Sequence, residues 1–344
     1  MKRRVINLTA GVLLALGGLL GSVPAAFAAN PAYGSCQEIA RTVNLTAGIL
    51  PPTATIRGTL CTPTTWAAGA HQVDLLVHGA SYNRTYWDWP VDPATYSYVD
   101  KTLQSGRATL AYDRLGAGTS SDTPSALVTT TSDAFVMHQL IGYLRGTQGY
   151  STVNIVGHSF GSIVAIEEVA TYHDADRLVL TGALHTTGTV FVNNGTSFEP
   201  ALLDPAFPGE LDPGYLTSVP GTRAALFYNS TADPAVIAYD EAHKDKASAA
   251  QFADGLAELL APAATNISQG ITVPVLSMVG DQDILFCGLL LTCTQANVQA
   301  FEAPFYTHAP SFDAVVVPNT AHDLGLHPSA PATYATINQW ILTH

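Results

Sequence analysis

Charged residues are scarce in this 344-residue chain, and basic residues are the scarcest. Only 12% of the residues are charged, and 14 lysines and arginines stand against 27 aspartates and glutamates, giving a formal net charge of −13. Nucleic-acid binding relies on clustered lysine and arginine side chains that neutralise phosphates. The composition therefore excludes nucleic acid as a partner, and its acidic excess favours a protein that stays dispersed in solution.

Long apolar runs are also missing, with one exception at the N-terminus. The basic stretch Lys2-Arg3-Arg4 precedes an apolar run from Leu8 to Leu20, and small residues around Ala26 to Ala29 follow. This order is typical of a secretory signal peptide, and the apolar run is short for a bilayer-spanning helix. We predict a signal peptide over residues 1–28, cleavage near Ala28 and a secreted protein without a stable membrane anchor. The arginine pair leaves Sec and twin-arginine export as alternatives.

Cysteine is rare, and the four cysteines all lie beyond the predicted leader. They are Cys36, Cys61, Cys287 and Cys293, and their spacing matches no zinc-binding pattern. An even number of cysteines in an exported chain predicts two disulfides, for which three pairings exist. Proximity in the sequence favours Cys36–Cys61 and Cys287–Cys293.

Short apolar strands alternate with helical stretches along most of the chain. The hydrophobic fraction of 47% is ample for a large core. After a polar N-terminal segment we predict a strand pair near 53–62, strands at 73–77, 108–112, 152–156, 177–181, 273–279 and 314–317, and helices at 93–104, 132–147, 162–170, 296–307 and 331–343. Such alternation predicts a mostly parallel sheet with helices on both faces.

One interval, between residues 187 and 271, interrupts this rhythm and contains no convincing strand. It is rich in Leu, Phe, Tyr and Ala rather than in charge, which disfavours a disordered insertion. A helix-forming stretch covers 234–260. We therefore predict a mainly helical lid over 189–270, inserted between two core segments, 29–188 and 271–344.

The most informative motif is Gly157-His158-Ser159-Phe160-Gly161, which follows an apolar strand and precedes a helical stretch. This context predicts a nucleophile elbow, a tight turn that exposes the serine hydroxyl above a sheet. Glycine is required at both ends of the motif because a side chain there would collide with the neighbouring strand or helix. The sequence therefore predicts Ser159 as a nucleophile.

Four further motifs stand in a fixed order around the elbow. They are Leu76–Ser81, Tyr112–Ser120, Val279–Asp283 and Val317–Asp323. Together the five motifs resemble those of the α/β-hydrolase superfamily, and specifically its lid-containing, serine-nucleophile esterases and lipases, over nearly all of residues 50–344. The resemblance implies an α/β-hydrolase fold and the chain order Ser, Asp, His for the three catalytic groups.

The resemblance also assigns roles to residues of these motifs. It implies Asp283 as the acid, with Asp281 as the alternative, and His322 as the base, with His327 as a competitor. The N–H groups of Ala80 and Phe160 would form the oxyanion hole. His78 and the Asp113-Arg114 pair are expected to brace loops.

A serine hydroxyl becomes a useful nucleophile only when a base takes its proton, and a carboxylate must orient that base. We interpret the chain as a secreted serine hydrolase that cleaves carboxylic esters and needs no metal or cofactor. A serine at the elbow argues against epoxide hydrolases and haloalkane dehalogenases, which carry aspartate there. An amide hydrolase or peptidase, a lactonase, and a non-catalytic binding protein remain alternatives.

Aromatic residues gather where the substrate would bind. Tyr82, Tyr86 and Trp87, with Trp89, follow the predicted oxyanion loop, and the predicted lid adds Phe191, Phe198, Phe207 and Phe227. An apolar pocket between core and lid would suit a hydrophobic small-molecule or lipid-like ester. Ordinary packing of lid against core explains the same residues equally well. The sequence indicates no oligomeric state.

Overall fold

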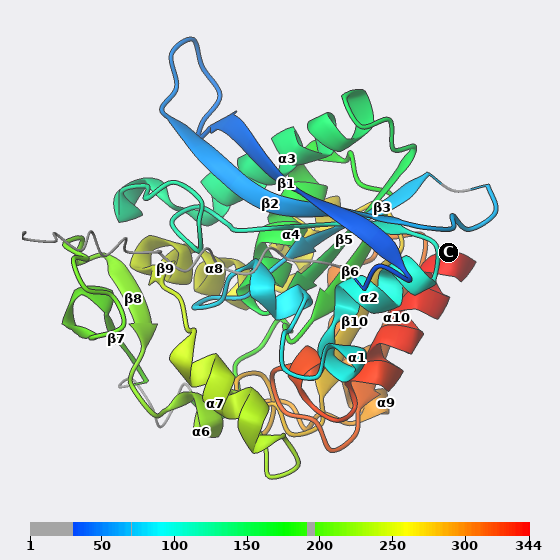
Figure 1. Ribbon diagram of the computed structural model, residues 1–344. Helices are drawn as coiled ribbons and strands as arrows, with labels where there is room; N and C mark the ends of the chain where they lie inside the picture. The colour runs from blue at the N-terminus through cyan, green and yellow to red at the C-terminus, as the bar shows by residue number, and fades with distance from the viewer. Residues whose placement is uncertain (1–29, 70, 191–196) are drawn as a thin grey trace, which may run out of the picture.

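The computed structural model describes residues 30–69, 71–190 and 197–344 (Figure 1). The predicted signal peptide and Phe191 lie outside these residues. Eight strands form one sheet in the order β1-β2-β4-β3-β5-β6-β10-β11. Their bounds are β1 (Gly34–Asn44), β2 (Thr53–Pro63), β3 (Gln72–Val77), β4 (Ala108–Tyr112), β5 (Thr152–His158), β6 (Arg177–Thr181), β10 (Val275–Gly280) and β11 (Phe312–Val317). All neighbours from β4 to β11 are parallel, which confirms the predicted sheet.

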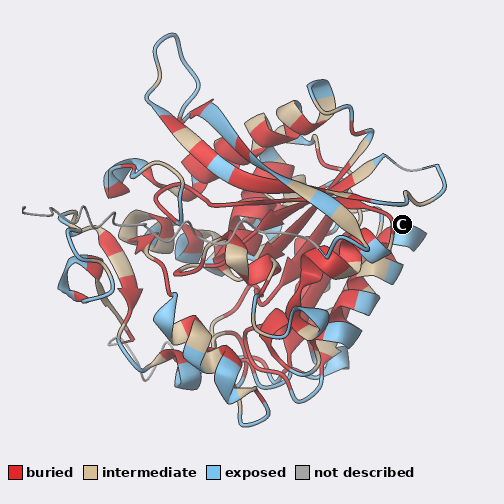
Figure 2. Ribbon diagram, in the orientation of Figure 1, coloured by how far each residue is buried: buried red, intermediate tan, exposed pale blue. Residues whose placement is uncertain are grey.

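Helices cover both faces of this sheet, as predicted. On one face α3 (Thr130–Gly146) packs beside α4 (Phe160–Tyr172), and on the other α2 (Tyr98–Gln104) packs beside α10 (Ala330–Thr343). Successive residues of a strand point to opposite faces. Leu75 of β3 accordingly joins the α3–α4 core and Leu76 joins the α2–α10 core. The central strands β3 and β5 are buried apart from the first residue of each (Figure 2).

Smaller elements complete the core. The short helix α1 (Pro93–Tyr96) precedes α2, and α9 (Gln295–Glu302) packs against β11. Short 3₁₀ turns occur at η1 (Arg84–Trp87), η2 (Ser125–Leu127), η3 (Ala201–Leu203), η4 (Ala263–Thr265), η5 (Ile267–Gly270), η6 (Ala303–Phe305) and η7 (Leu324–Leu326). Among the described residues, no helix combines the length and apolar character needed to cross a bilayer.

Strand β1 is the main element that the sequence did not predict. It pairs antiparallel with β2 along its whole length, at the edge of the sheet. Most of its side chains are exposed, and only Ile39 and Val43 are buried. An edge strand with one solvent-exposed face and many polar residues shows little hydrophobic alternation in its sequence. The segment was therefore predicted only as a polar extension.

The four cysteines pair as their proximity in the sequence favours. Cys36 of β1 is bonded to Cys61, its direct partner across β2, and Cys287 is bonded to Cys293 in the loop after β10. The second bond joins two cysteines that are six positions apart and follow Asp283 closely in the chain.

The chain between β6 and β10 forms an insertion that lies beside the sheet, to its left and below it in Figure 1. It contains α6 (Arg223–Phe227), α7 (Pro234–Ala242) and α8 (Ala249–Leu260). It also contains an antiparallel sheet of three short strands, β7 (Phe198–Pro200), β8 (Tyr215–Ser218) and β9 (Ala247–Ser248), where we predicted none. Strands this short leave little periodic pattern in a sequence.

The helix predicted over 234–260 is interrupted between α7 and α8. The interruption has a tertiary cause, since the N–H of Asp245 donates to the carbonyl of Ser81 at 2.9 Å. The buried Asp245 carboxylate accepts bonds from Asn83 Nδ2 at 3.0 Å and from the Gly118 N–H at 2.8 Å. These bonds draw the chain into the core loops and override its local helix propensity.

Candidate active site

Ser159 occupies the turn between β5 and α4, with φ 52° and ψ −121°. Few non-glycine residues adopt a positive φ, and such strain concentrates at functional positions. The flanking glycines permit the turn, because a Cβ on Gly157 would lie 2.7 Å from Ser162 Cα and one on Gly161 would lie 2.2 Å from the Val77 carbonyl oxygen. The turn therefore holds the Ser159 hydroxyl above the carboxyl ends of the parallel strands.

The loops after β10 and β11 bring an aspartate and a histidine to this hydroxyl. His322 Nε2 lies 2.8 Å from Ser159 Oγ, and His322 Nδ1 lies 2.9 Å from Asp283 Oδ2. His322 and Asp283 are almost completely buried. In this arrangement the Nδ1–H donates to the carboxylate, which leaves Nε2 free to accept the serine proton.

The two aspartates of the loop after β10 have different surroundings. Asp283 lies against His322, and its other oxygen accepts the N–H of Leu285 at 2.9 Å. Asp281 is exposed and accepts the N–H of Thr320 at 3.2 Å, which is the bonding of a turn residue. Geometry thus favours Asp283 over Asp281 as the partner of the histidine.

His327, the competing histidine, is engaged elsewhere. Its Nδ1 donates to the Asp323 carbonyl at 2.8 Å, and its Nε2 accepts the N–H of Ala321 at 3.3 Å. Both ring nitrogens are used by the backbone, so His327 fastens the loop that carries His322.

The electrostatic surroundings of His322 favour its charged form. Burial acts to lower the pKa of His322, but the charge and hydrogen bond of Asp283, helped by Asp323, raise the pKa above its ordinary value. Arg223 opposes this increase. The site is therefore built to stabilise an imidazolium when His322 accepts a proton.

The two residues predicted to form the oxyanion hole, Ala80 and Phe160, both border the same cavity as Ser159. Phe160 is the first residue of α4, and N–H groups in the first turn have no acceptor within their helix. Ala80 follows β3. Arg114 braces the loop before Ala80 through bonds to the carbonyls of His78 at 3.0 Å and Gly79 at 3.2 Å.

His78 is fully buried and bonded to the backbone on both sides. Its Nδ1 donates to the Gly79 carbonyl at 2.9 Å, and its Nε2 accepts the N–H of Arg114 at 3.0 Å. Burial and the neighbouring Arg114 charge lower the pKa of His78. These contacts are those of a residue that ties two loops together.

An apolar cavity of about 260 Å³ opens beside Ser159 and His322. The core contributes Phe160, Ile163 and Phe286, and the insertion contributes Phe198, Phe227 and Phe252. The contribution of α8, where Phe252, Leu256 and Leu259 line the cavity, was not predicted from the sequence. Their spacing of four and three residues places them on one helix face, which was the available signal.

The predicted substrate contacts are only partly in this cavity. The ring of Tyr82 lines it, as do Phe198 and Phe227, whereas Phe207 borders a separate polar cavity. Tyr86 and Trp87 do not line this cavity. Tyr86 stacks on His158 with ring centroids 4.3 Å apart, and Trp87 packs against Tyr98. Trp89 likewise packs against Tyr239. The order of these residues in the sequence does not indicate which of their side chains point into the cavity.

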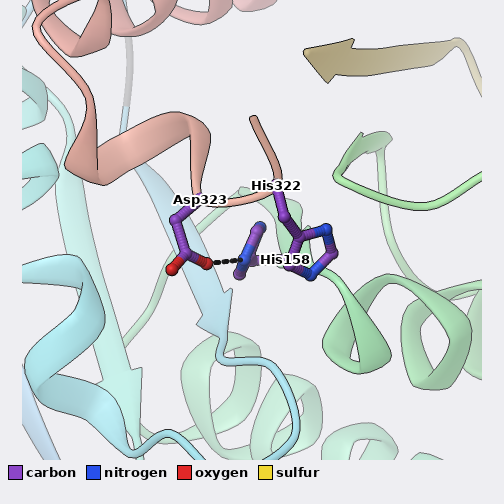
Figure 3. Close-up of side chains that lie close together, drawn as sticks. All are labelled: His158, His322 and Asp323. Atoms are coloured by element: carbon purple, nitrogen blue, oxygen red, sulfur yellow. Dashed lines mark hydrogen bonds and ion pairs between the residues drawn. The ribbon is translucent and has the colours of Figure 1, made fainter. Parts of the chain in front are cut away.

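A second buried pair, His158 and Asp323, lies beside Ser159 and His322 and was not predicted. His158 Nε2 donates to Asp323 Oδ1 at 3.0 Å, and the ring centroids of His158 and His322 are 5.0 Å apart (Figure 3). These three residues could in principle group around a metal ion. However, the ring nitrogens of His322 already contact Ser159 and Asp283, so His322 has no nitrogen left to offer. A second such group consists of His138, Glu168 and Asp174. It lies between α3 and the end of α4, and none of its residues lines the cavity.

A family model described as the alpha/beta hydrolase family matches residues 75–337. No curated protein matches the chain in sequence. Similar solved structures include a thermophilic esterase from Thermogutta terrifontis, with 18% identity, a TM-score of 0.60, and 88% of this chain and 98% of that chain covered.

Two further structures show the same likeness. A soluble variant of monoglyceride lipase from Saccharomyces cerevisiae is 15% identical, with a TM-score of 0.58 and coverage of 87% and 95%. The 2-hydroxy-6-oxo-6-phenylhexa-2,4-dienoate hydrolase from Rhodococcus sp. strain RHA1 is 16% identical, with a TM-score of 0.54 and coverage of 89% and 99%. Identities this low establish a common fold and do not transfer an activity.

Proposed function

The chain belongs to the alpha/beta hydrolase family, and from this premise we propose that it hydrolyses carboxylic esters with Ser159 as the nucleophile. One observation carries the proposal. Ser159, His322 and Asp283 are joined by contacts of 2.8 and 2.9 Å at the edge of an apolar cavity. This is the arrangement that acyl transfer to a serine requires.

The geometry suggests how each group acts. Ser159 Oγ attacks the ester carbonyl carbon while its proton passes to His322 Nε2, and Asp283 stabilises the resulting imidazolium. The N–H groups of Ala80 and Phe160 bind the oxyanion. His322 then returns the proton to the departing alcohol. A water molecule, activated by the same histidine, attacks the acyl-enzyme and releases the acid.

The cavity supports an uncharged, hydrophobic substrate. Its lining is almost entirely aliphatic and aromatic, and a charged group placed there would be desolvated without a partner. Residues 197–270 supply much of this lining, including Phe198, Phe227 and Phe252. We therefore assign the 189–270 insertion the role of a lid over the substrate. The N-terminal leader pattern and the two disulfides support secretion.

The substrate assignment predicts a dependence on chain length. Each CH₂ group that becomes buried contributes up to about 0.8 kcal/mol, or about fourfold in kcat/KM. For a series of p-nitrophenyl esters, kcat/KM should rise with acyl length until the cavity is filled and then fall. Phe252→Ala, which enlarges the cavity, should move the optimum to a longer chain. Faster turnover of an aminoacyl anilide than of any ester would contradict the proposal and favour an amide hydrolase.

The pH dependence follows from the surroundings of His322. Only the neutral imidazole can take the Ser159 proton, so kcat/KM should rise with pH through the pKa of His322 and then level off. Because Asp283 and Asp323 raise that pKa, the midpoint should lie above the ordinary histidine value of about 6.5. A pH profile of kcat/KM on a neutral ester measures this midpoint. A flat profile between about pH 5 and 8 would show that histidine is not the base.

A further inference from the structure

The insertion contains a fully buried ion pair directly behind the cavity wall. Arg223 of α6 donates from Nε to Asp240 Oδ2 at 2.8 Å and from Nη2 to Asp240 Oδ1 at 2.7 Å. The guanidinium lies 4.2 Å from the ring centroid of Tyr82 and 4.9 Å from that of Phe227, and both rings line the cavity. The planar fork of arginine holds the Asp240 carboxylate in one orientation.

A third bond connects this ion pair to the oxyanion loop. Arg223 Nη1 donates to Ser81 Oγ at 2.9 Å, and Ser81 immediately follows Ala80. Ser81 has a φ of 58°, a conformation that must be held by its surroundings. The insertion supplies a second support, because the N–H of Asp245 donates to the Ser81 carbonyl at 2.9 Å.

The same ion pair is connected to the loop of the catalytic histidine. The Tyr82 hydroxyl lies 3.0 Å from Asp240 Oδ2 and 2.5 Å from Asp323 Oδ2. The hydroxyl keeps its proton, because burial raises the pKa of Tyr82, and it lies within hydrogen-bond distance of both carboxylates. The other oxygen of Asp323 accepts from His158 (Figure 3).

Three core residues of this network stand next in the chain to a proposed catalytic group. Ser81 follows Ala80, His158 precedes Ser159, and Asp323 follows His322. The side chains of Ser81, His158 and Asp323 are buried. Buried ion pairs contribute little net stability, because the desolvation of two charges offsets their attraction. Stability alone is therefore a poor explanation for this network.

We propose that Arg223 and Asp240 are positioning residues for hydrolysis, through which the insertion fixes the oxyanion loop at Ser81 and the histidine loop at Tyr82 and Asp323. The inference rests on the proposed ester hydrolysis by Ser159. It assigns the insertion a role beyond covering the substrate, since its buried ion pair sets the relative positions of the groups that react.

The test compares variants in the network with a matched variant outside it. Tyr82→Phe keeps the ring in the cavity and removes only the hydroxyl that joins the two carboxylates. Asp240→Asn removes the charge that orients Arg223. The control is Asp204→Asn, which breaks another buried ion pair of the insertion, that of Asp204 with Lys244 at 2.6 Å. Each protein is measured for kcat and KM on a p-nitrophenyl ester, for the labelling rate of Ser159 by a fluorophosphonate, and for Tm.

Small displacements of reacting groups reduce turnover by up to about 10²-fold. We expect Tyr82→Phe and Asp240→Asn to lower kcat and the labelling rate by about tenfold to 10²-fold, with KM within about twofold of the wild-type value. Asp204→Asn should lower Tm and leave kcat unchanged. The proposal is overturned if Tyr82→Phe keeps the wild-type kcat, or loses no more activity than Asp204→Asn. Failure of the wild-type protein to label or to cleave any ester would instead overturn the proposed function, and this inference with it.

Discussion

Replacing Ser159 with alanine should lower kcat for ester hydrolysis by a factor on the order of 10⁶ and leave the fold intact. In the proposed mechanism the serine supplies the attacking oxygen, and without it the remaining groups would only bind substrate and stabilise charge. His322→Ala should cost about as much, because the serine then keeps its proton. The double variant should be little worse than either, since the groups act as a unit. Steady-state kinetics on a p-nitrophenyl ester measures all three.

A matched control for this experiment lies in the same cavity. Ser197 also lines it, and Ser197 belongs to the insertion rather than to the elbow. Ser197→Ala should keep kcat within a few-fold of the wild-type value and retain fluorophosphonate labelling. Additive losses in the Ser159 and His322 double variant, or labelling that survives Ser159→Ala, would contradict the assignment.

Asp283→Asn is expected to lower kcat by about 10⁴-fold, as the loss of the orienting carboxylate does in other serine hydrolases. An amide in place of the carboxylate can donate a hydrogen bond to His322 Nδ1. The histidine then carries its proton on Nε2, where it cannot accept one from Ser159. Circular dichroism should show an unchanged fold, which separates this effect from unfolding.

Asp281→Asn provides the internal control, because it makes the same chemical change two residues away. Asp281 is exposed, and its contact is with the backbone of Thr320. Its replacement should change kcat by no more than a few-fold. If Asp281→Asn were the more damaging of the two, the acid would have to be reassigned.

The parts of the fold that the sequence predicted are those with a local signal. The parallel strands are short apolar runs bounded by polar turns, so each is readable without knowledge of its neighbours. The elbow can be recognised in the sequence because the fold requires glycine at two of its positions. A side chain at Gly157 would collide with Ser162, and one at Gly161 would collide with the neighbouring strand β3. Strand β1 lacked such a signal, since its register is fixed by β2 and by the bond between Cys36 and Cys61.

The parts of the site that the sequence did not predict depend on the direction of side chains. Tyr82 and Tyr86 are four positions apart and chemically alike, yet only the first borders the cavity. Tyr86 is instead committed to His158 by stacking. Asp323 could be seen in the sequence only as the neighbour of His322. Its partners, Tyr82 and His158, come from distant segments that meet only in the folded chain.

The pairing of β1 with β2 bears on how the protein responds to proteolytic cleavage. The connection between the two strands projects from the molecule (Figure 1), and its residues Ile49 and Leu50 are 98% and 94% exposed. Exposed loop ends of this kind are preferred sites of proteolytic cleavage. A cut there would leave β1 attached twice, by the Cys36–Cys61 bond and by backbone pairing along all 11 of its residues. The nicked protein would therefore remain one covalent molecule with its sheet edge closed, and only a reductant would allow the N-terminal piece to leave.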